Sequence, residues 1–133
     1  MIIGTGQDIT DIRRIERTLN RFADRFITRC FAPVEIQKAE RRRAAGTHIA
    51  TYAKRFAAKE ACSKALGTGF SHGVFMRDII VQNDDMGKPV IVLAGGALER
   101  LQSLSNGRNA SVHLSLTDDH PYAMASVIIE CHD

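Results

Sequence analysis

The sequence has no long apolar run, no spacer-like segment and no internal repeat. No stretch of about 18 apolar residues occurs in the chain, which excludes a membrane-spanning helix. The segment after Met1 has no basic start and no cleavage site, so we expect a cytoplasmic protein that is not secreted. Linkers and low-complexity segments are missing too, which predicts one compact domain over residues 1–133.

Cysteines and histidines are few and show no metal-ligand spacing. Cys30, Cys62 and Cys131 are odd in number and widely separated, so no pair matches a redox or metal motif. We expect three reduced thiols, although Cys62 lies inside the strongest motif and keeps a catalytic thiol open as an alternative. The five histidines likewise predict no metal site.

The composition is that of a globular protein with a basic segment near its start. Hydrophobic residues make up 44% and charged residues 25%, and the net charge is +3. Arginines crowd the early part of the chain: Arg13, Arg14, Arg17, Arg21, Arg25, Arg29 and Arg41 to Arg43. This clustering predicts an anionic partner without identifying it.

Hydrophobic periodicity and turn residues predict an α+β fold. Strands are expected at residues 1–9, 74–81, 89–93, 110–117 and 122–130. Helices are expected from Thr10 or Asp11 to about Phe26, from Pro33 to Gly46, over 49–66 and over 95–104. Ile12, Ile15, Leu19, Phe22 and Phe26 are the expected core positions of the first helix. The helices lie mostly in the first half, and a four-residue turn at 118–121 predicts a largely antiparallel sheet.

Small residues predict a close contact between the first strand and the third helix. Side chains alternate along a strand, so Gly4, Gly6 and Asp8 share one face. Alanines repeat every four residues along the helix: Ala53, Ala57, Ala61 and Ala65. A bare glycine face lets a helix approach closely, and this packing would bring Asp8 near Glu60.

Asp8, Glu60 and Lys64 are the candidate chemical groups. Glu60 and Lys64 are four residues apart and share a helix face, where an exposed pair would be worth only about 0.3–0.5 kcal/mol. A lone aspartate at a strand end is usually a cap or turn residue. The alanine-rich surroundings indicate burial, however, and a buried carboxylate needs a partner or a metal. Two carboxylates, water and phosphate oxygens form the shell that Mg²⁺ prefers, and a lysine beside them would neutralise phosphate charge.

Two other patterns near these residues have competing interpretations. Gly67-Thr68-Gly69 could offer backbone N–H groups to a phosphate, or could simply end the helix. Gly4-Thr5-Gly6 does not predict a dinucleotide fold, because the third glycine and a parallel βαβ pattern are missing. His113 lies opposite the apolar face of its strand, where it either lines a cleft or is a surface residue.

Four segments together resemble the holo-[acyl-carrier-protein] synthases, which are small phosphopantetheinyl transferases of bacterial lipid synthesis. The longest is Phe56 to Gly69, which resembles the signature of that family. Gly4 to Ile9 resembles its opening segment, Gly87-Lys88-Pro89 a recurring turn, and Tyr122 to Glu130 its closing strand. The matches follow the family order from the first strand to the last.

The resemblance implies the phosphopantetheinyl transferase fold and a specific reaction. Family members move the phosphopantetheine arm of coenzyme A to a serine of an acyl carrier protein and release adenosine 3′,5′-bisphosphate. The positions of Asp8 and Glu60 would hold Mg²⁺, and the position of Lys64 would contact phosphate and protonate the leaving group. Asp8, Glu60 and Lys64 are therefore the expected catalytic residues. A homotrimer with sites at subunit interfaces is also implied by the resemblance.

The resemblance also implies which residues contact the two substrates. Coenzyme A would be bound by Lys59, Ser63, Lys64, Gly67, Thr68, Gly69, Lys88, Pro89 and His113. The acidic helix of the carrier protein would meet Arg14, Arg17, Arg21 and Arg25, unless these arginines are only a solvated face.

The chain departs from the common family pattern at two positions. Asp118 stands where many relatives carry a histidine, which puts a catalytic histidine there in doubt, although an acidic variant is known. Cys62 stands where many relatives have a bulkier residue. The alternatives are a basic module that binds an acidic protein or nucleic acid, and a coenzyme A binder without catalysis. We do not expect a nucleic acid as partner, because RNA binding usually brings exposed aromatic residues among the basic ones, and here Phe22 and Phe26 fall on the apolar stripe. We do not expect a membrane partner either, because the chain has no long apolar run.

Overall fold

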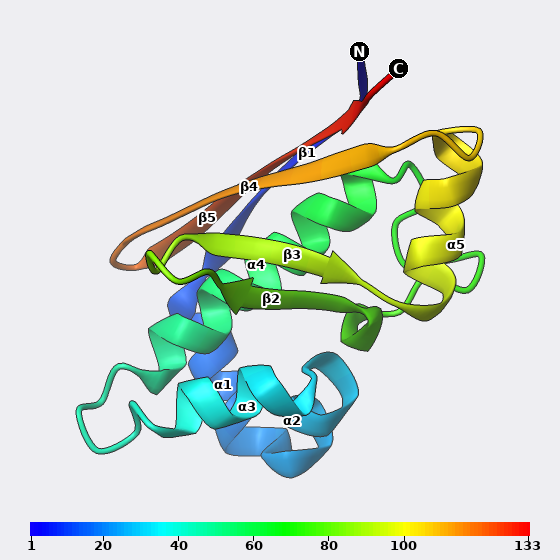
Figure 1. Cartoon of the computed structure of the whole chain (residues 1–133). Coiled ribbons are helices and arrows are strands. Elements are labelled where there is room, and N and C mark those ends of the chain that lie inside the picture. Colours follow the sequence, from blue (N-terminus) through cyan, green and yellow to red (C-terminus); the bar gives the residue numbers. More distant parts are fainter.

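The computed structural model describes all residues from 1 to 133 and has five helices and five strands (Figure 1). The strands are β1 (Ile2–Asp11), β2 (Ile79–Asn83), β3 (Pro89–Leu93), β4 (Ala110–Asp119) and β5 (Tyr122–Cys131). The helices are α1 (Ile12–Phe22), α2 (Asp24–Cys30), α3 (Pro33–Glu40), α4 (His48–Ala65) and α5 (Gly95–Leu104), with a short 3₁₀ turn, η1 (Met76–Asp78). The predicted α+β class is therefore confirmed. None of the helices combines the length and the apolar character needed to cross a bilayer.

The main sheet is antiparallel and has the strand order β1-β5-β4. The strand β5 lies in the middle, so that Gln7 of β1 and Ser115 of β4 both pair with Ser126. The strands β2 and β3 form a separate antiparallel hairpin. Both chain ends lie side by side at one end of the main sheet, and the N-terminal amine donates to the carbonyl of Cys131 at 2.9 Å (Figure 1).

The predicted contact between the glycine face of β1 and α4 is present. A Cβ atom on Gly6 would collide with the carbonyl oxygen of Ala61, and one on Gly4 would collide with that of Ala65. Only glycine therefore allows the strand to approach the helix backbone this closely. Ala61 is fully buried and Ala65 nearly so. This contact places the end of β1, with Asp8, against the last turns of α4.

One face of the main sheet packs on α4 and the other is uncovered. Along β5, Ala123, Ala125, Val127 and Ile129 are buried and alternate with exposed residues, as expected for a half-buried strand. The uncovered face exposes large apolar side chains beside β1, with Ile9 at 61%, Met124 at 43% and Ile128 at 40%. A second apolar cluster lies between α4 and the helices α1 to α3.

The structure corrects several element boundaries. The first helix stops at Phe22, because Ala23 has a φ of 44°, and α2 then runs in a new direction. Phe22 is consequently 43% exposed rather than in the core, whereas Ile27 is buried. The helix from Pro33 ends at Glu40, and the strand expected from residue 74 begins only at Ile79, after η1. No glycine or proline marks the break at Ala23, so tertiary packing overrides the helix preference of alanine there.

Candidate active site

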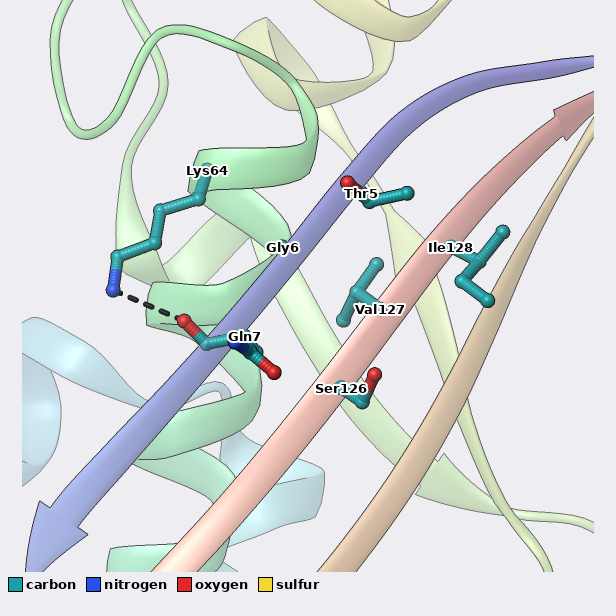
Figure 2. A pocket seen from close by; sticks show the side chains of 7 residues that line it. All are labelled: Thr5, Gly6, Gln7, Lys64, Ser126, Val127 and Ile128. Atoms are coloured by element: carbon teal, nitrogen blue, oxygen red, sulfur yellow. Dashed lines mark hydrogen bonds between the residues drawn. The ribbon is translucent and has the colours of Figure 1, made fainter.

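Asp8 and Lys64 meet where β1 crosses the C-terminal part of α4. The ammonium of Lys64 lies 3.3 Å from Oδ1 of Asp8. It also donates to the backbone carbonyl of Gln7 at 3.0 Å (Figure 2). The Asp8 side chain is 17% exposed, whereas that of Lys64 is 53% exposed. Lys64 is thus anchored to the strand and still open to a ligand.

Glu60 lies one turn before Lys64 and is electrostatically coupled to Asp8. Burial raises the pKa of the Glu60 carboxyl above its ordinary value, and the negative charge of Asp8 raises it further, against the cations Lys64 and Arg14. No donor within the chain bonds this carboxylate. The structure therefore brings Asp8, Glu60 and Lys64 together, as the packing of glycines on alanines predicts.

Two neighbouring carboxylates fit a divalent cation that keeps part of its shell for other ligands. Asp8 and Glu60 supply carboxylate oxygens, and Glu60 lacks a protein donor that would compete for them. No group of three or more histidine, cysteine or acidic side chains gathers anywhere in the chain. Two carboxylates alone do not fill the coordination shell of a metal ion, so water or substrate oxygens would have to complete it. Mg²⁺, which usually keeps several waters or substrate oxygens, fits this donor set.

Two adjoining hollows follow β1 beside Lys64. One has about 520 Å³ and is lined by Thr5, Gly6, Gln7, Lys64, Ser126, Val127 and Ile128 (Figure 2). The other has about 330 Å³ and is lined by Gln7, Asp8, Ile9, Lys64 and Met124. Because Gln7 and Lys64 border both hollows, a ligand that contacts the Lys64 ammonium has space along the strand in both directions. These volumes lie in the usual range for ligand sites.

The glycines after α4 serve mainly to end the helix. The N–H of Gly67 donates to the carbonyl of Lys64 at 3.0 Å, and the N–H of Gly69 donates to that of Ser63 at 3.1 Å. Both glycines have positive φ values, 81° and 59°, as expected at a helix C-terminus. Of this segment, only the N–H of Thr68 has no acceptor within the chain. Of the backbone N–H groups that the sequence suggested for binding a phosphate, only this one is therefore free to do so.

Lys59 and Ser63 were expected to contact coenzyme A, but both side chains are buried, so this expectation is corrected. Lys59 is fully buried, and its ammonium donates to Glu35 at 2.7 Å, to the carbonyl of Met76 at 3.0 Å and to that of Ile79. All three of its donors are used inside the protein, so none can reach a ligand. Ser63 is 1% exposed and donates to the carbonyl of Glu60 at 2.7 Å. Both side chains hold α4 in place rather than face solvent.

Lys88, Pro89 and His113 lie away from Lys64 within one chain. None of them lines either hollow beside β1. Lys88 is exposed in the turn between β2 and β3, and His113 lies on the uncovered sheet face, 3.0 Å from a Glu130 oxygen. Pro89 borders a different hollow.

That hollow is a cationic one, which the sequence alone did not reveal. It has about 250 Å³ and is lined by Lys38, Arg42, Lys54, Arg55, Asn83, Gly87, Pro89, Leu116 and Asp118. Arg55 is only 5% exposed, and its Nε has no partner although one Nη donates to Asn83 at 3.1 Å. The four cations of the lining would stabilise an anion bound in this hollow. Arg55 directly precedes the long motif and was not singled out by it, and only the fold places Lys38 and Arg42 beside it.

Asp118, which stands at the position of the common family histidine, borders this cationic hollow. Its carboxylate lies 3.4 Å from the ammonium of Lys54. It is the one acidic side chain among four cationic ones in the lining. Asp118 therefore offsets part of the positive charge rather than acting at Asp8 and Glu60.

The four arginines expected to meet a carrier protein are all exposed. Arg14, Arg17 and Arg21 lie on α1, and Arg25 lies on α2 beyond the break. Arg14 is close enough to the site to lower the pKa of Glu60. The row of charges thus starts at the candidate active site and leads away from it.

The comparisons with known proteins agree with the geometry. Residues 4–125 match the sequence profile of the 4′-phosphopantetheinyl transferase superfamily. A holo-[acyl-carrier-protein] synthase of Parvibaculum lavamentivorans is 58% identical over 97% of this chain and 96% of that protein. The crystal structure of the Neisseria meningitidis synthase is 36% identical, covers 98% of this chain and 99% of the other, and superposes with a TM-score of 0.84.

A third similar protein has been solved with a ligand. The Bacillus anthracis synthase, in complex with CoA (3′,5′-ADP), is 34% identical over 99% of both chains, with a TM-score of 0.77. The resemblance found in the sequence motifs therefore extends over almost the whole chain and over its fold. The chain belongs to the 4′-phosphopantetheinyl transferase superfamily, in the group of the holo-[acyl-carrier-protein] synthases.

Proposed function

We propose that this protein transfers the 4′-phosphopantetheine arm of coenzyme A to a serine hydroxyl of an apo acyl carrier protein. The serine oxygen forms a bond to the phosphorus that carries the pantetheine, and the bond from this phosphorus to the nucleotide oxygen breaks. Adenosine 3′,5′-bisphosphate leaves, and the serine proton is released. The observation that carries the proposal is the meeting of Asp8, Glu60 and Lys64 beside the two hollows along β1.

Asp8 and Glu60 are the residues that would hold Mg²⁺. Burial and the negative charge of Asp8 both raise the pKa of Glu60, so leaving the ionised pair without a cation is costly. When bound there, Mg²⁺ supplies positive charge that offsets the charge of the coenzyme A diphosphate. Magnesium dependence is thus part of the proposal and rests on this donor set.

Lys64 would contact the diphosphate and protonate the leaving oxygen. Its ammonium has three donors, of which one bonds the Gln7 carbonyl and one faces Asp8. The third donor is free and the side chain is half exposed, so a phosphate oxygen in either hollow can accept from it. Because Asp8 and the Gln7 carbonyl hold the ammonium in one position, little reorganisation is needed as charge develops on the leaving oxygen.

The cationic hollow would bind the other anionic group of coenzyme A. With the diphosphate at Lys64, the remaining dianion of the ligand is its 3′-phosphate. The hollow offers the cations Lys38, Arg42 and Arg55 to such a group. Pro89 borders it, which would give this residue the contact with coenzyme A that the family turn implies.

The proposal includes a homotrimer with the site shared between subunits. Arg55 and Glu60 are five residues apart on α4, which puts them about 140° apart around the helix axis. No residue lines both the cationic hollow and the hollows beside Lys64. A neighbouring copy that supplied the cationic hollow would complete the site. The uncovered sheet face, with its exposed Ile9, Met124 and Ile128, offers an apolar surface for that copy.

The partner is an acidic acyl carrier protein, and the proposed place of action is the cytoplasm. Arg14, Arg17, Arg21 and Arg25 are free to meet an acidic helix beside the serine. Charges at such a rim steer encounter and orientation more than they add affinity.

The decisive experiment incubates the protein with apo carrier protein, coenzyme A and Mg²⁺ and weighs the carrier by mass spectrometry. We expect a carrier heavier by one phosphopantetheine, with metal-dependent turnover. Glu60→Gln should lower the rate by about 100-fold, because it removes a ligand of the cation that would offset the negative charge of the transition state. Glu99→Gln, on the exposed side of α5, is the matched control and should react like the wild type. No adduct with any divalent cation would overturn the proposal.

A further inference from the structure

Thr10 makes a buried contact with the site that no part of the proposed reaction uses. The residue is 3% exposed, and its hydroxyl donates to Oδ2 of Asp8 at 2.7 Å. This is the only hydrogen bond that the hydroxyl makes. A buried hydroxyl is costly without a partner, so the contact is maintained in the folded protein.

The position of Thr10 on β1 explains the contact. Residues two apart on a strand share a face, so Thr10 and Asp8 both point toward α4. Thr10 pairs across the sheet with Ala123, which is fully buried, while Asp8 lies nearer the open side of the site. The β-branched side chain has few rotamers on a strand, which keeps the hydroxyl directed at the carboxylate.

The two oxygens of Asp8 consequently have different neighbours. Oδ2 is held by Thr10, and Oδ1 faces the Lys64 ammonium at 3.3 Å. The plane of the carboxylate is thereby fixed between a neutral donor on one side and a cation on the other. Without the hydroxyl, the carboxylate could rotate and pair with Lys64 through both oxygens. That pairing would take Asp8 away from a cation and Lys64 away from a phosphate.

We infer that Thr10 is a positioning residue that orients the Asp8 carboxylate for cation binding and keeps it from a tighter ion pair with Lys64. This inference rests on the proposed function, because it assumes that Asp8 is a cation ligand. Groups that hydrogen-bond a metal ligand typically change metal affinity or activity by about 10–100-fold when they are removed.

The test compares Thr10→Val, which keeps the shape and loses the hydroxyl, with Thr10→Ser, which keeps the hydroxyl. Mn²⁺ affinity is measured by electron paramagnetic resonance with coenzyme A present, and thermal unfolding is recorded for each variant. We expect Thr10→Val to weaken Mn²⁺ binding about tenfold and to raise the half-saturating Mg²⁺ concentration for transfer similarly. Thr10→Ser should retain Mn²⁺ affinity close to that of the wild type. Thr10→Ala, which also lacks the hydroxyl, replaces Thr10→Val if the valine variant does not fold.

Asp8→Asn serves as the reference that separates this inference from the proposed function. If Asp8→Asn loses Mn²⁺ binding and the variants without the hydroxyl bind Mn²⁺ like the wild type, the role of Thr10 is wrong and the metal site stands. If Asp8→Asn binds Mn²⁺ like the wild type, Asp8 is not a ligand, and both the metal site and the role of Thr10 are wrong. Equal loss of affinity in Thr10→Val and Thr10→Ser would also overturn the inference, because packing rather than the hydroxyl would then matter.

Discussion

The ammonium of Lys64 lies 3.3 Å from the carboxylate of Asp8, although 56 residues separate them in the chain. Lys64 comes from the last turn of α4 and Asp8 from β1. The pair exists because Gly4 and Gly6 leave no side chain between the strand and the helix backbone. The geometry of the candidate site thus depends on glycines that have no chemical function of their own.

Gly6→Ala should both destabilise the protein and reduce its activity. The added methyl group would collide with the carbonyl oxygen of Ala61, so strand and helix must move apart. Inserting atoms at a packed contact typically costs about 1–3 kcal/mol. Urea unfolding should show this loss, and the transfer rate should fall because Asp8 moves away from Glu60. Ser126→Ala, on the uncovered sheet face, is the control for stability, and equal unfolding midpoints for the two variants would contradict the prediction.

Glu60→Gln should raise stability at neutral pH in the absence of divalent cations. Burial and the charge of Asp8 raise the pKa of Glu60 from its ordinary value of 4.5. Between the unfolded and the folded pKa the folded state binds more protons, so the free energy of unfolding contributed by this group falls as pH rises. Below pH 4.5, residue 60 should contribute equally to the free energy of unfolding in the wild type and in Glu60→Gln. At neutral pH the variant should be more stable. Urea titrations with a chelator at both pH values measure this, and a wild type that is more stable at neutral pH would refute it.

Arg17→Glu combined with Arg21→Glu should weaken the use of the carrier protein. Reversing two exposed charges on α1 should raise KM for the carrier by about tenfold and flatten its salt dependence, because steering by opposite charges is lost. Arg14 is better left unchanged, because it also lowers the pKa of Glu60. The exposed Arg77→Glu is a control outside this row of arginines. An unchanged KM would mean that the arginines only form a solvated face.

The cationic hollow should discriminate coenzyme A from 3′-dephospho-coenzyme A. Replacing Lys38 and Arg42 by methionine removes two cations from the lining, so KM for coenzyme A should rise about tenfold, while that for the dephosphorylated form should change little. Asp118→Asn removes the one negative charge of the lining and should lower KM for coenzyme A. Steady-state kinetics with both substrates test this. Equal effects on both substrates would place the 3′-phosphate elsewhere.

Mixing two impaired variants should restore activity if subunits share the site. Asp8→Asn disables the carboxylate half, and the Lys38 and Arg42 double variant weakens the cationic half. In mixed trimers, some interfaces would combine two intact halves, so transfer should recover part of the wild-type rate at low coenzyme A. Native mass spectrometry establishes that the subunits exchange. Exchange without recovered activity would show that each chain carries a whole site.

The sequence alone predicted the α+β class, the α4 helix and the grouping of Asp8, Glu60 and Lys64. Strong periodicity, capping residues and the spacing of glycines and alanines are local signals, so they can be interpreted without knowledge of the fold. Its motifs also identified the family. The same signals failed at Ala23, where no residue type announces the change of direction, and at Val74, where an apolar run proved to be loop.

Only the tertiary structure decided which charged side chains face a ligand. Lys59 and Lys64 lie in one helix and one motif. Lys59 is nevertheless fully buried in an ion pair with Glu35, whereas Lys64 is half exposed beside Asp8. Arg55 gains its place in a cationic hollow from residues of α3 and β4, which are distant in the chain. Residue type and spacing determine which face of a helix a side chain occupies. What covers that face depends on long-range packing, and this decides whether a charge is structural or available for chemistry.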